Sequence, residues 1–188
     1  KKKKKNVKAA IPVLGDAKET ISHLLKLVKP NSHENWFQRF QECAKIEQEK
    51  VINRELHPDT GSLSMGEVIN IINKYTKGDA IIVSDVGQHQ MVACRYSKFS
   101  KSKSNITSGG LGTMGFGLPA ALGAKLGVPD RTVIAIIGDG GFQMTIQELA
   151  TIYQTKAKVK LLLLNNEFLG MVRQWQQLFF DKRYSSTD

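Results

Sequence analysis

The sequence predicts an α/β fold in which a parallel β-sheet is covered by helices on both faces. Three short and mostly apolar runs, residues 80–84, 132–137 and 159–164, alternate with segments of helical periodicity. Runs that are apolar at successive positions are typical of strands buried on both sides in a parallel sheet. A chain that alternates strand and helix in this way forms crossover units, which define the α/β class.

The segment before the first predicted strand contains mainly helices. Residues 10–14 are expected to be a short extended piece, and Gly15-Asp16 a turn and helix cap before an amphipathic helix over residues 18–28. A further helix is expected through residues 36–43. Ser62 or Ser64 can cap the next helix, because a serine hydroxyl accepts a hydrogen bond from first-turn N–H groups. The remaining expected helices cover residues 65–72, 88–96, 117–126, 145–153 and 171–178.

These elements predict three parts of the chain. Residues 1–28 are expected to be the tail of a preceding central domain, because one strand and one helix cannot bury an apolar stripe by themselves. Residues 29–60 are expected to form a helical connector. Residues 61–188 are expected to form the main domain, incomplete at its C-terminus because further strands would be needed to complete such a sheet.

The composition argues against several classes of protein. The 188 residues are 41% hydrophobic and carry a formal charge of +10, of which Lys1 to Lys5 supply five. Nucleic-acid binding is disfavoured because no aromatic side chains are interleaved with this lysine run. No apolar window reaches the roughly 18 residues of a membrane helix, so no membrane association is expected. Cys43 and Cys94 lack a CxxC spacing, which favours reduced thiols in a cytoplasmic protein.

Oxygen-bearing side chains follow two of the predicted strands. Asp139 lies in a Gly-Asp-Gly-Gly turn after the second strand, and Asn165-Asn166 follows the third. Adjacent parallel strands would bring Asp139 and Asn166 to the same edge of the sheet, where ligands of open α/β sheets gather. Carboxylate and amide oxygens suit Mg²⁺, and glycine backbone leaves room for a diphosphate. Either turn alone would be ordinary, but the two together favour a metal-diphosphate site.

A second glycine-rich loop leaves an alternative open. Residues 110–115 fit the pattern GxGxxG, and Asp130 follows at the distance of a ribose-binding acid, as in a dinucleotide-binding module. The polar run 103–108 precedes these glycines where a dinucleotide fold has a hydrophobic strand, and Asp130 comes before its strand rather than after it. Dinucleotide binding is therefore the less favoured hypothesis.

Several separated motifs resemble one family of enzymes. Gly138-Asp139-Gly140 followed by Asn165-Asn166 is similar to the thiamine diphosphate motif of pyruvate-decarboxylase-like enzymes. Three further motifs make the chain resemble, more specifically, the catalytic subunit of acetolactate synthase (acetohydroxyacid synthase) from about residue 11 to residue 184. They are residues 86–91 (VGQHQM), 107–119 (TSGGLGTMGFGLP) and 170–176 (GMVRQWQ).

The resemblance implies the thiamine diphosphate-binding fold and assigns cofactor roles to individual residues. It makes residues 61–188 the domain that binds thiamine diphosphate and Mg²⁺, with Gly112 and Met114 at the aminopyrimidine. It implies Trp175 as a substrate-channel residue that favours 2-ketobutyrate as acceptor, although a large aromatic on an amphipathic helix is equally expected. The implied metal ligands are Asp139, Asn166 and the main-chain carbonyl of Phe168. The implied diphosphate-binding residues are Val86, Gly87, Gln88, His89, Gly140, Gly141, Gly170 and Met171.

The resemblance also implies a reaction, partners and a missing catalytic group. Pyruvate would be decarboxylated and its two-carbon unit joined to a second 2-keto acid, in branched-chain amino-acid biosynthesis. A homodimer or tetramer, a regulatory small subunit and FAD held mostly outside this chain are the implied partners. The activating glutamate of the family belongs to an amino-terminal domain, and neither Glu148 nor Glu167 matches its motif. The 188 residues alone are therefore expected to be inactive. Another thiamine diphosphate-dependent decarboxylase or carboligase remains the alternative.

Overall fold

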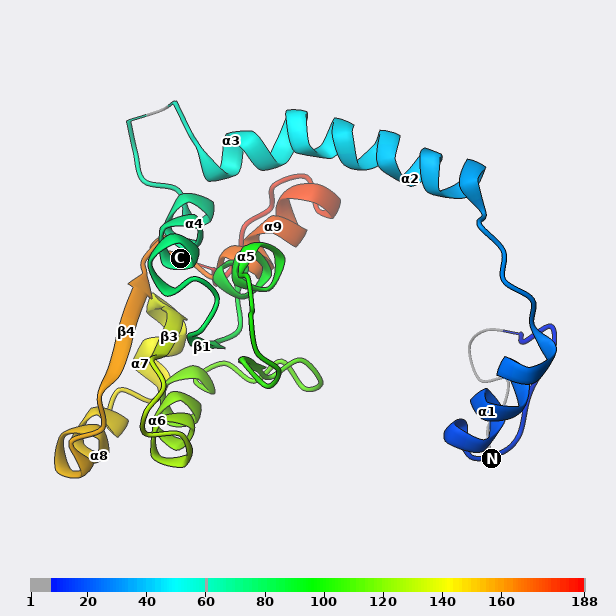
Figure 1. The fold of residues 1–188 in the computed structure, drawn as a ribbon. Helices are drawn as coiled ribbons and strands as arrows, with labels where there is room; N and C mark the ends of the chain where they lie inside the picture. The colour runs from blue at the N-terminus through cyan, green and yellow to red at the C-terminus, as the bar shows by residue number, and fades with distance from the viewer. Residues whose placement is uncertain (1–7, 60, 188) are drawn as a thin grey trace. The chain divides into compact units, whose positions relative to one another are not determined.

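A computed structural model describes residues 8–59 and 61–187 of the chain (Figure 1). The chain divides between Lys45 and Ile46 into two units. The first unit contains α1 (Ala17–Leu27) and most of α2 (Glu34–Glu47). Asp16 caps α1 as predicted, since its Oδ1 accepts a hydrogen bond from the Lys18 N–H at 2.9 Å. No residue of α1 or α2 is buried, so the described residues of this unit have exposed apolar side chains and form no core among themselves.

The second unit is built on a sheet of four parallel strands in the order β2-β1-β3-β4. The three strands predicted from their apolar runs are confirmed. An additional strand, β2, was not predicted, because its three residues lie in a polar stretch and pair with β1 alone at the edge of the sheet. The strands are β1 (Ile81–Ser84), β2 (Asn105–Thr107), β3 (Val133–Gly138) and β4 (Val159–Leu164).

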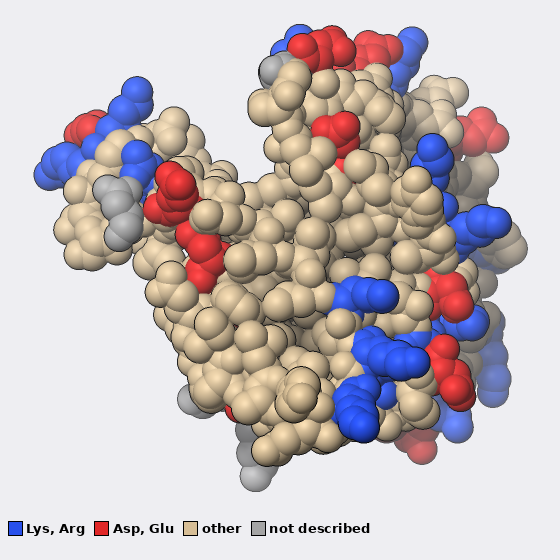
Figure 2. Space-filling view, turned by 90° about the vertical axis from the view of Figure 1, so that its left-hand side faces the viewer, with Lys and Arg blue, Asp and Glu red and all other residues tan. Residues whose placement is uncertain are grey.

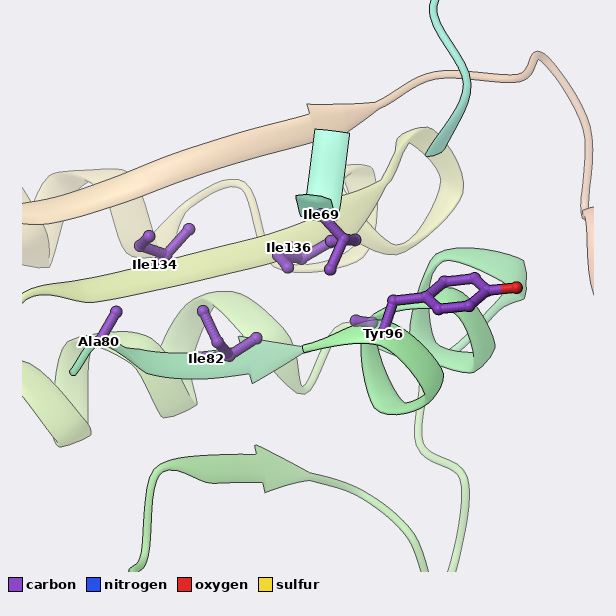
Figure 3. Close-up of a cluster of buried hydrophobic side chains, with 7 residues drawn as sticks. Ile69, Ala80, Ile82, Tyr96, Ile134 and Ile136 are labelled. Atoms are coloured by element: carbon purple, nitrogen blue, oxygen red, sulfur yellow. The ribbon is translucent and has the colours of Figure 1, made fainter. Parts of the chain in front are cut away.

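Helices cover both faces of this sheet, as predicted. Figure 3 shows Ile82 of β1 and Ile134 and Ile136 of β3 on one side of the sheet, where Ile69 and Tyr96 join the same buried cluster. That cluster packs under α4 (Met65–Thr76) and α5 (Gln88–Tyr96). On the other side, a second cluster packs under α6 (Gly117–Gly127); it contains Ile81, Val83, Leu118, Ala121, Val133, Ala135 and Ile137. The central strands β1 and β3 are therefore buried on both faces, which explains their uninterrupted apolar sequences.

The remaining helices agree with the predictions in part. Ser64, one of two predicted caps, begins α4 by accepting a hydrogen bond from the Glu67 N–H at 3.1 Å. Residues 10–14 were expected to be extended but form no strand. The helix expected at residues 145–153 begins three residues later, at Glu148. The other elements are the π-helix η1 (Gln48–Ile52), α3 (Asn53–Leu56), α7 (Asp139–Met144), α8 (Glu148–Thr155) and α9 (Gly170–Phe179).

The strand register places the predicted site residues at one edge of the sheet. Gly138 at the end of β3 pairs with Leu164 at the end of β4. Asp139 and Asn165 therefore leave neighbouring strands at the same level. Asp139 begins the short helix α7, where an acidic side chain interacts favourably with the helix N-terminus. The turn predicted after β3 is thus shorter than expected, and the chain becomes helical at once.

No helix in the described ranges is both long enough and apolar enough to cross a bilayer. On the face shown in Figure 2, basic side chains are interspersed with acidic ones.

Candidate functional site

A cavity of about 230 Å³ lies at the carboxyl edge of the sheet, within the second unit. Four segments that are far apart in the sequence form its wall. Three of them lie at the carboxyl ends of β1, β3 and β4, and the fourth is the glycine loop before α6. Such a meeting of strand ends is the usual ligand site of open α/β sheets. The lining residues are Val86, Gly87, Gln88, His89, Gly112, Met114, Gly138, Asp139, Gly140, Gly141, Asn166, Phe168, Leu169, Gly170, Met171 and Val172.

The structure brings every residue predicted to bind the cofactor or the metal to the wall of this one cavity. Trp175 is the exception among the predicted site residues. It lies on α9 outside the cavity wall, its side chain is 60% exposed, and its ring stands 4.8 Å from the ring of Phe179. Its role in substrate selection stays a prediction. The cavity is also lined by three residues that were not predicted to belong to the site, Gly138, Leu169 and Val172.

Three oxygen donors of the predicted metal site line the cavity together. Asp139 offers a carboxylate, Asn166 an amide oxygen and Phe168 a main-chain carbonyl. The amide nitrogen of Asn166 donates to Oε1 of Gln88 at 3.4 Å, so the Asn166 oxygen is not engaged in that bond. Among residues 8–59 and 61–187, no cluster of three His, Cys, Asp or Glu side chains could hold a metal ion. This donor set of one acid and neutral oxygens suits a hard cation such as Mg²⁺ when an anionic ligand completes the coordination.

Glycines form the part of the wall where the backbone lies closest to the cavity. A Cβ added to Gly87 or Gly138 would lie 2.6 or 2.8 Å from Cε1 of His89, so this ring is held between two glycines. A Cβ added to Gly140 would lie 3.0 Å from the Leu169 side chain and 3.5 Å from Cε of Met114. Only glycine leaves this space open, and bare backbone N–H groups are what an anion such as a diphosphate requires.

His89 is a buried histidine with an unusual environment. Its side chain is 6% exposed, and its Nε2 has no hydrogen-bond partner in the part of the chain that the structure describes. Burial lowers the pKa of His89, because removal from water disfavours the charged imidazolium. The nearby carboxylates of Asp85 and Asp139 oppose this decrease without cancelling it. The ring is therefore neutral at neutral pH, and its unpaired Nε2 is buried in the wall of the cavity.

The lowered pKa of His89 predicts how stability depends on pH. The unfolded chain binds a proton on this histidine near the ordinary pKa of about 6.5, whereas the folded chain binds it only at lower pH. The unfolded state therefore binds more protons just below pH 6.5, and the free energy of unfolding must fall as the pH falls through that range. We expect His89→Gln to reduce this slope in denaturant titrations of the ligand-free protein at a series of pH values.

The exposed His57 provides the matched control for that measurement. The variant His57→Gln should keep the slope of the parent protein, because replacing an exposed histidine leaves the buried imidazole in place. An unchanged slope in His89→Gln would contradict the assignment of His89 as the group responsible.

Asp85 is a further residue of this region that the sequence analysis did not single out. It follows β1 directly, its side chain is fully buried, and it lies behind the cavity wall rather than in it. The same rule that selected Asp139, a carboxylate at the carboxyl end of a strand, could have found it.

Comparison with known families agrees with this geometry. Residues 85–188 match the family described as thiamine pyrophosphate enzyme, C-terminal TPP binding domain. This match begins at Asp85 and includes every segment of the cavity wall. The chain belongs to this family of TPP-binding domains.

Individual relatives of this TPP-binding domain are acetolactate synthases. The chain is 46% identical to an acetolactate synthase large subunit of Lactococcus lactis over 97% of its length, which is 31% of that protein. It is 42% identical to the isozyme 3 large subunit of Escherichia coli, over 97% of this chain and 32% of the relative. It is 44% identical to an acetolactate synthase of Mycobacterium bovis, over 98% of this chain and 30% of the relative. The chain thus spans about a third of the length of these relatives.

Proposed function

We propose that the protein is a thiamine diphosphate-dependent carboligase of the acetolactate synthase type. It would decarboxylate pyruvate and join the two-carbon unit to a second 2-keto acid, in branched-chain amino-acid biosynthesis. The observation that carries this proposal is the single cavity lined by all the cofactor and metal residues that the sequence predicts. The similarity to acetolactate synthases over nearly the whole chain supports the choice among thiamine diphosphate enzymes.

The residues around the cavity fit the cofactor and its metal ion. Asp139, Asn166 and the carbonyl of Phe168 would hold Mg²⁺, which in turn would bind the diphosphate oxygens. Gly140, Gly141 and Gly170 line the cavity without side chains, and the diphosphate would lie against their backbone. An added Cβ at each would also lie too close to neighbouring side chains. When bound, thiamine diphosphate supplies the electron sink for decarboxylation of a 2-keto acid.

The other diphosphate-binding residues and the glycine loop would complete this site. Val86, Gly87, Gln88, His89 and Met171 line the cavity beside the proposed metal ligands. Gly112 and Met114 line it from the glycine loop, and they would contact the aminopyrimidine of the cofactor.

The chain's own residues would mainly position the cofactor and exclude water. Leu169, Met171 and Val172 give the cavity an apolar wall near the proposed metal ligands. Electrostatic interactions are stronger in such a water-poor site than in bulk water. No glutamate lines the cavity within the described residues. The group that exchanges a proton with the cofactor is therefore proposed to come from another part of the protein, and we expect residues 1–188 alone to form no product.

The proposal extends to the assembly of the complete protein. Relatives that are called large subunits imply a smaller partner, so we propose a regulatory small subunit. We also propose a homodimer or tetramer, because the missing proton-exchanging group can then come from a neighbouring chain. FAD, if bound, would be held mostly by parts of the protein outside these residues.

The product formed from pyruvate tests the proposed function. The complete protein, supplied with pyruvate, thiamine diphosphate and Mg²⁺, is expected to release carbon dioxide and acetolactate. Acetolactate can be measured after its conversion to acetoin, and omission of Mg²⁺ should abolish its formation. Release of acetaldehyde without acetolactate would instead identify a decarboxylase, and the absence of any reaction with pyruvate would contradict the proposal.

The same assay tests Trp175 as the proposed acceptor-selecting residue. With pyruvate and 2-ketobutyrate supplied together, Trp175→Leu is expected to lower the ratio of acetohydroxybutyrate to acetolactate by roughly 10-fold, the usual effect of one methylene in a shaped pocket. Trp36→Leu is the matched control, because that tryptophan has the same exposed fraction of 60% and lies in the other unit. Equal ratios in both variants and the parent would remove Trp175 from the substrate channel.

A further inference from the structure

The carboxylate of Asp85 is bonded by an unusual set of donors. Its Oδ1 accepts a hydrogen bond from the N–H of Val86, and both of its oxygens accept from the N–H of Gly115, at 3.0 and 3.1 Å. Its Oδ2 also accepts from the N–H of Gly117 at 3.3 Å. Within the described part of the chain, these backbone N–H groups are the only donors of hydrogen bonds to the Asp85 carboxylate. A fully buried carboxylate is stable only when such bonds replace its hydration.

These bonds connect two segments that are 30 or more positions apart in the sequence. Asp85 follows β1, and its own N–H donates to the carbonyl of Ile136 on β3 at 2.9 Å, so its backbone is part of the sheet. Gly115 and Gly117 end the loop that carries Gly112 and Met114 into the cavity. The carboxylate therefore attaches this loop directly to the rigid carboxyl edge of the sheet.

Asp85 also lies close to α7, which carries part of the cavity wall. A Cβ added to Gly141 on α7 would lie 2.8 Å from Oδ2 of Asp85, and one added to Gly117 would lie 2.9 Å from its Cβ. The carboxylate thus lies between the glycine loop and the segment that holds Asp139 and Gly140. Met114 of the glycine loop also approaches α7, since its Cε lies 3.5 Å from the position of a Cβ on Gly140.

We propose that Asp85 is a positioning residue, which sets the glycine loop and Met114 at a fixed distance from the diphosphate end of the cavity. This inference rests on the proposed function, because it concerns how one cofactor is held at both of its ends. An amide could not replace the carboxylate, since its NH₂ group would face backbone N–H groups and at least one bond would be lost. The loop would then move relative to α7, and the ring end of the cofactor would lose its fixed support.

How firmly Asp85 holds the glycine loop can be measured by hydrogen exchange without any ligand. In the ligand-free complete protein, we expect Asp85→Asn to increase hydrogen exchange of the Gly115 and Gly117 amides by roughly 10- to 100-fold, as observed by mass spectrometry of peptides covering residues 108–118. Ser84→Ala is the matched control. It removes a fully buried hydroxyl that has no hydrogen-bond partner in the described residues, one position earlier on the same strand. Unchanged exchange in Asp85→Asn would overturn the proposal whether or not the protein binds thiamine diphosphate.

Binding of two ligands separates positioning from a general structural role. We expect Asp85→Asn to weaken the affinity for thiamine diphosphate in the presence of Mg²⁺ by roughly 10- to 100-fold, whereas the affinity for inorganic pyrophosphate stays as in the parent. The circular dichroism of the bound aminopyrimidine should change in the variant as well. A parallel loss of both affinities would indicate disruption of the whole site and would overturn the proposal. Failure of the parent protein to bind thiamine diphosphate would instead contradict the proposed function.

A second variant keeps the test decisive if Asp85→Asn does not fold. Thr145 also holds this loop, because its hydroxyl donates to the carbonyl of Gly115 at 3.0 Å. Thr145→Val should weaken thiamine diphosphate binding in the same direction but by less, since a neutral hydrogen bond contributes less than a charged one, and should spare pyrophosphate binding. Equal affinity of Thr145→Val and the parent for thiamine diphosphate would show that the position of this loop does not matter for the cofactor.

Discussion

Replacement of Asp139 by alanine is expected to abolish the stabilisation of the complete protein by thiamine diphosphate and Mg²⁺. A ligand present at about 100 times its dissociation constant stabilises the folded state by about 2.7 kcal/mol. Asp139 supplies the only carboxylate of the cavity wall among the described residues, so its loss leaves Mg²⁺ with neutral oxygens alone. The measurement is the midpoint of thermal unfolding with and without the two ligands. In their absence the variant should lose less than about 1 kcal/mol, the contribution of an acid at a helix N-terminus.

Asp130 is the matched control for Asp139, and it also tests the dinucleotide alternative. It is an exposed acid outside the cavity wall, so Asp130→Ala should leave the response to thiamine diphosphate and Mg²⁺ intact. If the glycine loop bound a dinucleotide, NAD would stabilise the parent protein and Asp130→Ala would remove that effect. A full response to thiamine diphosphate in Asp139→Ala would contradict the proposed metal site.

The variant Gly138→Ala is expected to destabilise the fold by about 1–3 kcal/mol, the usual cost of overfilling a packed site. The backbone at Gly138 has φ −82°, which any residue adopts, so the cost comes from space alone. The new Cβ would lie 2.8 Å from Cε1 and 2.9 Å from Nδ1 of His89, whose ring cannot move away because Gly87 holds its other side. Gly138 and His89 both line the cavity, so binding of thiamine diphosphate should weaken as well. Denaturant unfolding and ligand titration measure the two effects.

Two further variants show whether the contact with His89 causes the destabilisation by Gly138→Ala. Gly123→Ala places a methyl group on α6 where nothing lies within 4 Å, and it should stabilise the protein by about 0.5–1 kcal/mol through helix propensity. Combining Gly138→Ala with His89→Ala should cost less than the sum of the single changes, because removal of the ring gives the new methyl group space. Additive effects in this double-mutant cycle would disprove the proposed collision.

Much of the fold and of the site could be predicted because the signals are local. The apolar runs that form β1, β3 and β4 are visible in the sequence, and parallel strands end at a common edge of a sheet. Asp139 and Asn166 follow from that rule alone, whereas the role of Met114 required the resemblance to a known family. β2 could not be predicted, because its polar residues 105–107 become a strand only through pairing with β1.

By itself the sequence determined the class of fold, the order of β1, β3 and β4 with the main helices between them, and the edge at which acidic and amide side chains meet. These features depend on the periodicity of apolar residues over a few positions and on general rules for parallel sheets. Only the tertiary structure decided that His89 is enclosed by Gly87 and Gly138, and that Asp85 binds the N–H groups of Gly115 and Gly117. The contact of His89 with Gly138 and those of Asp85 with the glycine loop join segments about 30 to 50 positions apart. No local pattern contains them, and they exist only once the sheet has brought those segments together.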